Sequence, residues 1–248
     1  MTLVSKRFFL GRSKMVAFLD DIEQLGELGS ISVYIPHGSS NLEVEALLKK
    51  ARVHPLPDNI IQLAVSAKNG AALFWGDMRK CLVLPPFPLN EEAIFNGYVT
   101  KPLSQLVTDD YVIGLVLVHL GSYAIGICKG EKLISSKVGS GLIHGRHKKG
   151  GSSQQRFQRR RENQIREFLD RVCLHIREHF EINMQSINYI VYGGPHQTIL
   201  LLQKRCPILQ SLKERVLTSI VVPTLRQRIL EMSISRIWSS SVIDWQEE

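Results

Sequence analysis

One stretch of the chain, residues 144–161, combines two adjacent glycines, two adjacent glutamines and a dense run of positive charge. It holds seven lysines and arginines and no aspartate or glutamate. Gly150 and Gly151 let the backbone reach φ > 0 and approach a partner closely, because glycine has no Cβ. Gln154 and Gln155 follow, and an amide near such a tip can hold a water molecule although it is not a strong base. Positioning and oriented hydrogen-bond donors lower reaction barriers without a charged base, and this is the chemistry that the stretch offers.

The positive charge of the same stretch indicates a polyanionic partner. Ser152 or Ser153 can serve as N-cap of a helix that continues to about Phe180, so arginines fall in its first turns. Cations there oppose the helix dipole and each costs roughly a few tenths of a kcal/mol, which a polyanion offsets. A solvated basic loop is the alternative, but it needs neither the glycines nor the amides. The candidate contacts are Arg146, His147, Lys148, Lys149, Arg156, Arg159, Arg160 and Arg161.

The stretch needs a rigid element on either side, and the surrounding pattern predicts both. Strands are expected at 111–119, 123–128 and 131–138, with short turns that make them antiparallel neighbours. The helix to Phe180 comes next, with Val172 and Ile176 on its apolar face. A strand at 187–192, a helix at 196–204, a strand at 219–222 and a helix at 223–238 complete the series. This is the order of a ribonuclease-H-like mixed α/β sheet, with right-handed crossovers in its later part.

The first hundred residues predict a smaller N-terminal α/β region. Helices are expected at 14–28, 41–52 and 58–67, and strands at 31–36, 71–75 and 81–84. The connection from 85 to 108 has weaker periodicity and begins with a proline cluster. A boundary there gives an N-terminal region of residues 1–104 and a second domain of residues 105–248. A surface loop inside one domain is the alternative interpretation of the prolines.

The glycine pair and the start of the long helix resemble a known loop. Gly-Gly followed by Ser153 and then Arg156-Phe157 is similar to the Gly-Gly-Gln loop of eukaryotic and archaeal class 1 peptide-release factors. Ser152 stands where those factors place the catalytic glutamine, which is displaced here to Gln154. The loop is closer to the Gly-Gly-x-Ser-Gln type of release-factor-like peptidyl-tRNA hydrolases. That family includes the ankyrin-repeat and zinc-finger hydrolases of eukaryotic ribosome quality control and shorter bacterial and archaeal relatives.

The resemblance covers about residues 108–245 well and implies a fold and a function. The fold is that of the release factor middle domain, and the activity is hydrolysis of ribosome-bound peptidyl-tRNA with Gln154 positioning water. Gln155 stays a competing candidate, because nothing anchors the alignment between Gly151 and Arg156. The implied partners are the large ribosomal subunit with its rRNA and peptidyl-tRNA, with the cations on phosphate. No cofactor, metal, DNA or membrane is expected.

The sequence also bears on three other classes, which are a two-metal nuclease, a metal-free RNA endonuclease and a non-catalytic binding factor. A two-metal nuclease needs carboxylates clustered on central strands, and residues 111–119 contain none. Metal-free cleavage near the tRNA 3′ end, as by an endonuclease on stalled ribosomes, stays open, and so does a non-catalytic ribosome-binding factor. His144 and His147 are candidate general bases, although histidines beside cations often only join an RNA-binding surface. Gly193-Gly194-Pro195 suits either a phosphate at a helix N-terminus or a tight strand-to-helix turn.

Composition bounds the class of protein. A chain of 248 residues, 44% hydrophobic and 22% charged, can bury a sizeable core, and its net charge of +8 suggests a polyanionic partner. Cys81, Cys128, Cys173 and Cys206 are far apart, so we expect no disulfide framework and no metal site. Cys128 and Cys173 lie in apolar stretches and are expected as small buried hydrophobes in a reducing cytoplasm. The early apolar runs are too short to span a membrane, which also predicts a cytoplasmic protein.

Overall fold

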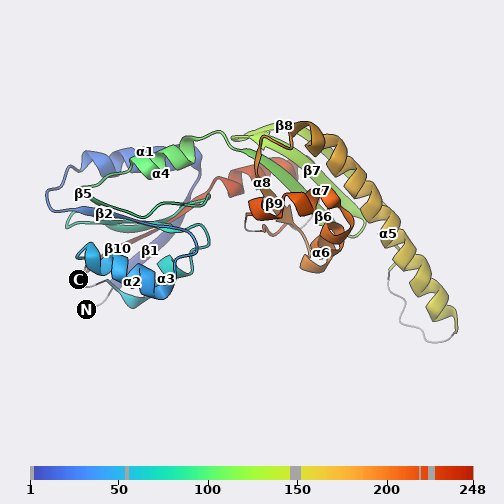
Figure 1. Ribbon diagram of the computed structural model, residues 1–248, viewed down its shortest axis with the longest axis horizontal. Helices are drawn as coiled ribbons and strands as arrows, with labels where there is room; N and C mark the ends of the chain where they lie inside the picture. The colour runs from blue at the N-terminus through green and yellow to red at the C-terminus, as the bar shows by residue number, and fades with distance from the viewer. Residues whose placement is uncertain (1–2, 54–55, 146–151, 218, 223–226, 248) are drawn as a thin grey trace. The chain divides into compact units, whose positions relative to one another are not determined.

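The chain divides into two compact units. The computed structural model describes residues 3–53, 56–145, 152–217, 219–222 and 227–247 (Figure 1). Unit 1 comprises Met1–Asp109 together with Ser235–Glu248, and unit 2 comprises Asp110–Ile234. The expected boundary near residue 104 therefore lies close to the observed one, but the expected second domain is wrong at its end. The last residues belong to unit 1, because their strand pairs with the N-terminal sheet.

Unit 1 is built on a six-stranded antiparallel sheet with the order β1-β10-β4-β3-β2-β5. The strand at the end of the chain thus lies between the first strand and β4. The bounds are β1 Leu3–Leu10, β2 Ile31–Ile35, β3 Ala71–Trp75, β4 Lys80–Leu84, β5 Ala93–Asn96 and β10 Ser240–Glu247.

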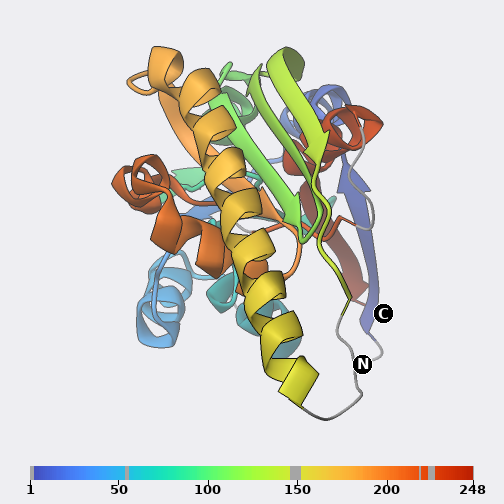
Figure 2. The same cartoon turned by 90° about the vertical axis from the view of Figure 1, so that its right-hand side faces the viewer.

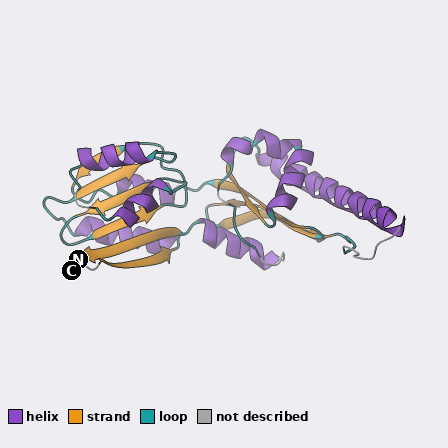
Figure 3. Cartoon of the chain, turned by 90° about the horizontal axis from the view of Figure 1, so that it is seen from below, coloured by secondary structure: helices purple, strands orange, loops and turns teal. Residues whose placement is uncertain are grey.

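Helices cover both faces of this sheet (Figure 3). One face packs against α1 and α4, and the opposite face packs against α2 and α3. Alternation along β2 explains the two cores, because Val33 and Ile35 join one cluster while Tyr34 between them joins the other. The bounds are α1 Arg12–Gln24, α2 Asn41–Lys50, α3 Asp58–Val65 and α4 Lys101–Thr108.

Several elements of unit 1 differ from the sequence prediction. The expected helices and strands between residues 14 and 84 are present, with ends that differ by at most four residues from those expected. The pattern missed β1, β5, α4 and β10. Trp245 of β10 is 2% exposed and packs in the core of unit 1.

Unit 2 contains a four-stranded mixed sheet with the order β8-β7-β6-β9. The two hairpins make β6, β7 and β8 antiparallel neighbours as predicted, and β9 runs parallel to β6. The expected strand at 219–222 is reduced to one isolated bridge, between Ile220 and Gly193, and a second bridge joins the preceding Val216 to Ile190. The bounds are β6 Val112–His119, β7 Ser122–Lys129, β8 Lys132–Ser140 and β9 Ile187–Gly193.

One face of this sheet holds the main core of unit 2 (Figure 2). The long helix α5 lies along it, together with α6 and α7, and the inward-facing residues of β6, β7 and β9 meet them. Leu230 of α8 approaches Gly126 from the opposite face, since Gly126 alternates with Ile125 and Ile127 of the main core. The bounds are α5 Ser152–Phe180, α6 His196–Arg205, α7 Pro207–Ser211 and α8 Gln227–Ile237, with short 3-10 turns η1 Glu181–Asn183 and η2 Lys213–Arg215.

Candidate functional site

The first turns of α5 project beyond the body of unit 2 (Figures 1 and 2). Residues 155–160 all have exposed side chains, and the first buried side chain further along is that of Phe168. Sixteen residues separate Ser152 from Phe168, which is about 24 Å of helix at 1.5 Å per residue. Val172 and Ile176 are fully buried, which confirms the predicted apolar face. The helix is therefore anchored by its later turns and carries residues 155–160 into solvent.

Three arginines gather on one side of this projecting segment. Arg159 and Arg160 lie three and four residues after Arg156, the spacing that puts side chains on one helix face. All three are exposed, and by helical periodicity they lie opposite Val172 and Ile176. We call Arg156, Arg159 and Arg160 the arginine face. The arginine face lies in the second and third turns of α5, and no acidic residue lies in the first turn, so the positive end of this helix is suitable for binding a polyanion.

Charge is divided unequally between the two units. Unit 1 carries 12 lysines and arginines against 14 aspartates and glutamates, which is a net charge of −2. Unit 2 carries 19 against 9, which is +10. The net charge therefore favours binding of a polyanion to unit 2 and disfavours its binding to unit 1.

The amides and glycines of the predicted tip are only partly described. Gln154 lies in the first turn of α5, and Gln155 after it is exposed. The helix begins at Ser152, so Ser152 and Ser153 are both helical residues, and the expectation that one of them is the N-cap is wrong. The other predicted tip residues lie outside the described residues, namely Arg146, His147, Lys148, Lys149, Gly150 and Gly151.

Arg161, the last arginine of the predicted phosphate-binding set, has a different environment. Its Nε donates a hydrogen bond to the carbonyl oxygen of His144 at 3.1 Å, and its side chain is half-buried. The backbone N–H of His144 in turn donates to Oε1 of Gln164 at 3.2 Å. Arg161 thus contacts the protein itself, and the sequence did not separate it from Arg159 and Arg160.

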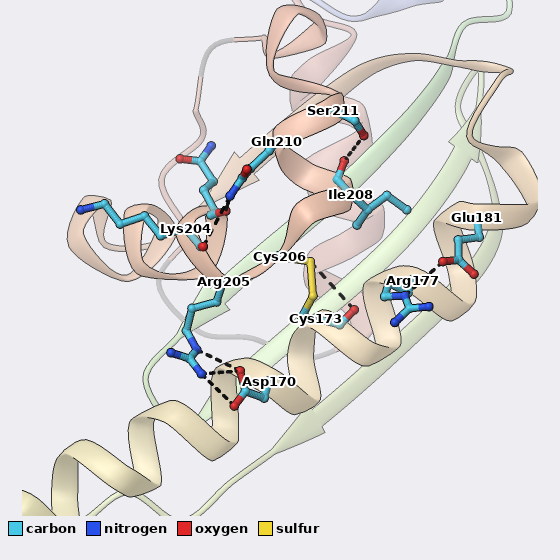
Figure 4. Close-up of a disulfide and its surroundings, with 11 residues drawn as sticks. Asp170, Cys173, Arg177, Glu181, Lys204, Arg205, Cys206, Ile208, Gln210 and Ser211 are labelled. Atoms are coloured by element: carbon cyan, nitrogen blue, oxygen red, sulfur yellow. Dashed lines mark hydrogen bonds and ion pairs between the residues drawn. A yellow bond between two sulfur atoms is a disulfide. The ribbon is translucent and has the colours of Figure 1, made fainter.

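The anchored half of α5 is tied to α6 by two neighbouring links (Figure 4). Nε and Nη2 of Arg205 donate to the two carboxylate oxygens of Asp170, each at 2.9 Å. Three residues further along α5, Cys173 forms a disulfide with Cys206, the residue after Arg205. The expectation of no disulfide is therefore wrong for this pair, because helix packing brings together two cysteines that are 33 residues apart. Such pairing cannot be deduced from spacing alone.

The Gly-Gly-Pro segment and Cys128 have structural roles. Gly194 has φ +121° and a Cβ there would lie 2.0 Å from the carbonyl oxygen of Val118, so the Gly-Gly-Pro segment is a tight turn. Burial raises the pKa of the Cys128 thiol to about 12, which keeps it protonated. Among the residues with a described structure, no three His, Cys, Asp or Glu side chains are placed to hold a metal ion. Within the same residues, no helix is long and apolar enough to cross a membrane.

The chain is similar to curated proteins of translation termination. Peptide chain release factor subunit 1 of Aeropyrum pernix is 27% identical over 202 residues, covering 68% of this chain and 53% of that protein. The protein of the same name from Methanopyrus kandleri is 31% identical over 144 residues, covering 57% of this chain and 35% of that protein. The chain thus spans about half the length of these relatives or less. The class is that of release-factor-like proteins.

A family model identifies the group more narrowly. Residues 111–243, more than half of the chain, match the model described as acVLRF1, Actinobacteria/chloroflexi VLRF1 release factor. The chain belongs to this release factor family, which confirms the resemblance noted at the Gly-Gly loop. Among solved structures, archaeal translation termination factor aRF1 is 17% identical with a TM-score of 0.37, covering 92% of this chain and 73% of that chain. Archaeoglobus fulgidus Pelota is 10% identical with a TM-score of 0.32, covering 93% and 61%.

Proposed function

We propose that this protein hydrolyses peptidyl-tRNA on the ribosome, in rescue or quality control of translation. In the reaction, the oxygen of a water molecule attacks the carbonyl carbon of the ester between peptide and tRNA. The bond to the ribose oxygen breaks, that oxygen takes up a proton, and the peptide leaves with a new carboxylate. Gln154 positions the attacking water, and Gly150 and Gly151 allow the backbone close to the ester.

The observation that carries this proposal is the placement of Gln154. It lies in the first turn of a helix whose residues 155–160 are exposed to solvent, and the arginine face follows within six residues. An amide at such a place reaches a buried RNA cavity while the arginines behind it bind the surrounding phosphates. Family membership supports the same assignment, since the matched residues 111–243 include this loop and helix.

The partners follow from the same arrangement. We infer that unit 2 binds the large ribosomal subunit through its rRNA and acts on the peptidyl-tRNA held there, which places the protein in the cytoplasm. The net charge of +10 on unit 2 and the exposed arginine face support this. The strand order β8-β7-β6-β9, with bridges continuing beyond β9, supports a ribonuclease-H-like sheet of the release factor middle-domain type.

The experiment compares Gln154→Ala with Gln155→Ala on purified large subunits that carry labelled peptidyl-tRNA. Loss of one preorganised polar group costs about 2–4 kcal/mol of barrier, so Gln154→Ala should release peptide roughly 30- to 1000-fold more slowly. Gln155→Ala, the matched control one residue along, should lose much less. Both variants should still sediment with the subunits.

The products decide between the proposal and its alternatives. Free peptide together with intact tRNA supports ester hydrolysis. Peptide that still carries 3′ nucleotides of tRNA would identify the protein as a tRNA 3′-end endonuclease and give Gln154 a role at the phosphodiester. A wild-type protein that sediments with the subunits but releases no peptide would be a non-catalytic ribosome-binding factor. Equal release by the wild type and Gln154→Ala would reject the assignment of this glutamine.

A further inference from the structure

The backbone of His144 is held from both sides by side chains of α5. Its N–H donates to Oε1 of Gln164 at 3.2 Å, and its carbonyl oxygen accepts from Nε of Arg161 at 3.1 Å. Arg161 and Gln164 are three residues apart, the spacing of neighbours on one helix face. Both polar groups of one peptide residue are therefore satisfied by two adjacent side chains of the helix, which restricts where this residue can lie.

The chain before His144 is fitted closely to the same helix. Gly141 donates its N–H to the carbonyl oxygen of Gly121 at 2.9 Å, and a Cβ on Gly141 would lie 2.8 Å from the ring of Phe168. Ile143 then packs against the main core of unit 2, as does the half-buried Ile165 of α5. The connection from β8 is thus seated on α5 as far as His144.

Arg161 differs from the neighbouring arginines by its position around the helix. It lies four residues before Ile165 and eleven before Val172, so it continues the stripe that faces the core. Arg159 and Arg160 are exposed, whereas Arg161 is half-buried and bonded to the loop backbone. Three consecutive arginines therefore serve two purposes, with two on the arginine face and one directed to the base of the loop.

We propose that Arg161 and Gln164 are positioning residues that clamp the base of the Gly-Gly loop. They fix the point at which the chain leaves the body of unit 2, and α5 fixes the point at which it returns at Ser152. With both ends set, seven residues connect them, and the entropy cost of bringing those two ends together is met before any partner binds. This inference rests on the proposed function, because it assigns the clamp to the positioning of Gly150, Gly151 and Gln154.

The first test measures the clamp without any activity. Amide hydrogen exchange at His144 is followed in the full chain for the wild type, Gln164→Leu and Gln164→Glu. Leucine removes the acceptor, so exchange should accelerate on the order of five- to tenfold, while glutamate keeps an oxygen in place and should restore protection. Unchanged exchange at His144 in Gln164→Leu, in a protein that stays folded, would overturn the proposal.

The second test separates positioning from phosphate binding. The variants Arg161→Met and Arg160→Met each lose one positive charge, at adjacent positions of α5. For both, peptide release is measured from large subunits that carry peptidyl-tRNA. Arg161→Met should lower kcat on the order of tenfold or more at unchanged KM, because a misplaced group slows the step and not the encounter. Arg160→Met should raise KM and flatten its salt dependence. Arg161→Lys, which keeps a donor, should recover part of kcat.

The two tests fail in different ways. Arg161→Met with the same KM increase and salt dependence as Arg160→Met would make Arg161 a phosphate contact and overturn the clamp. A wild type that releases no peptide would reject the proposed function, and exchange at His144 would then decide the clamp alone. If Gln164→Leu shows faster exchange at the His144 amide but a wild-type kcat, the contact exists but does not position the loop. That result also overturns the proposal.

Discussion

Neutralising the arginine face should weaken ribosome binding in a salt-dependent way. The perturbation is the triple variant Arg156→Gln, Arg159→Gln and Arg160→Gln. All three side chains are exposed on the projecting half of α5, so their replacement leaves no buried group without a partner. Removal of cations from the start of a helix also relieves an unfavourable dipole interaction. The variant should therefore fold with a Tm no lower than that of the wild type.

The magnitude follows from counting phosphate contacts. Each neutralised phosphate contributes roughly 0.7–0.9 to the slope of log K against log salt, so three contacts contribute about 2–3. Between about 50 and 200 mM salt, the wild type should lose roughly 20- to 40-fold more affinity than the variant. At low salt the variant should already bind more weakly.

The assay is co-sedimentation with large ribosomal subunits over a salt series. The matched control is Lys14→Gln, Lys49→Gln and Lys68→Gln, which removes the same charge from exposed positions of unit 1. The control should keep the wild-type slope. Equal slopes for the wild type and the arginine-face variant would refute the argument that this face binds phosphate. Equal losses in both variants would attribute the effect to net charge and not to the face.

Two further predictions concern stability. Cys206→Ala removes the disulfide to Cys173 and should lower the free energy of unfolding, measured in urea without reductant, by about 3–4 kcal/mol. With reductant, the free energy of unfolding of the wild type should fall to that of the variant. Burial raises the pKa of Glu27, but hydrogen bonds from Tyr98 and the backbone N–H groups of Met78 and Asp77 outweigh this and hold the pKa below its usual 4.5. Glu27→Gln should cost about 1–2 kcal/mol at pH 7, and unfolding curves should converge as pH falls through the lowered pKa.

Local patterns determined most of the helices and strands before any packing was known. The helix at 152–180 follows from its composition and its apolar spacing, with Val172 and Ile176 buried as expected. The hairpins of β6, β7 and β8 follow from alternation and turn residues within a few positions of each other. The Gly-Gly motif is also evident in the sequence alone, because its residues are consecutive. The family match bears out the resemblance drawn from that loop.

Only the tertiary structure decided the contacts between distant segments. The pairing of β10 with β1 and β4 joins the two ends of the chain, and the sequence of β10 gives no indication of its partner strands. Cys173 and Cys206 meet because α5 packs beside α6. Arg161 separates from Arg159 and Arg160 because the helix turns it toward the carbonyl of His144, 17 residues away. A residue's type and its neighbours specify local conformation, but which groups meet across a fold depends on packing that no single segment contains.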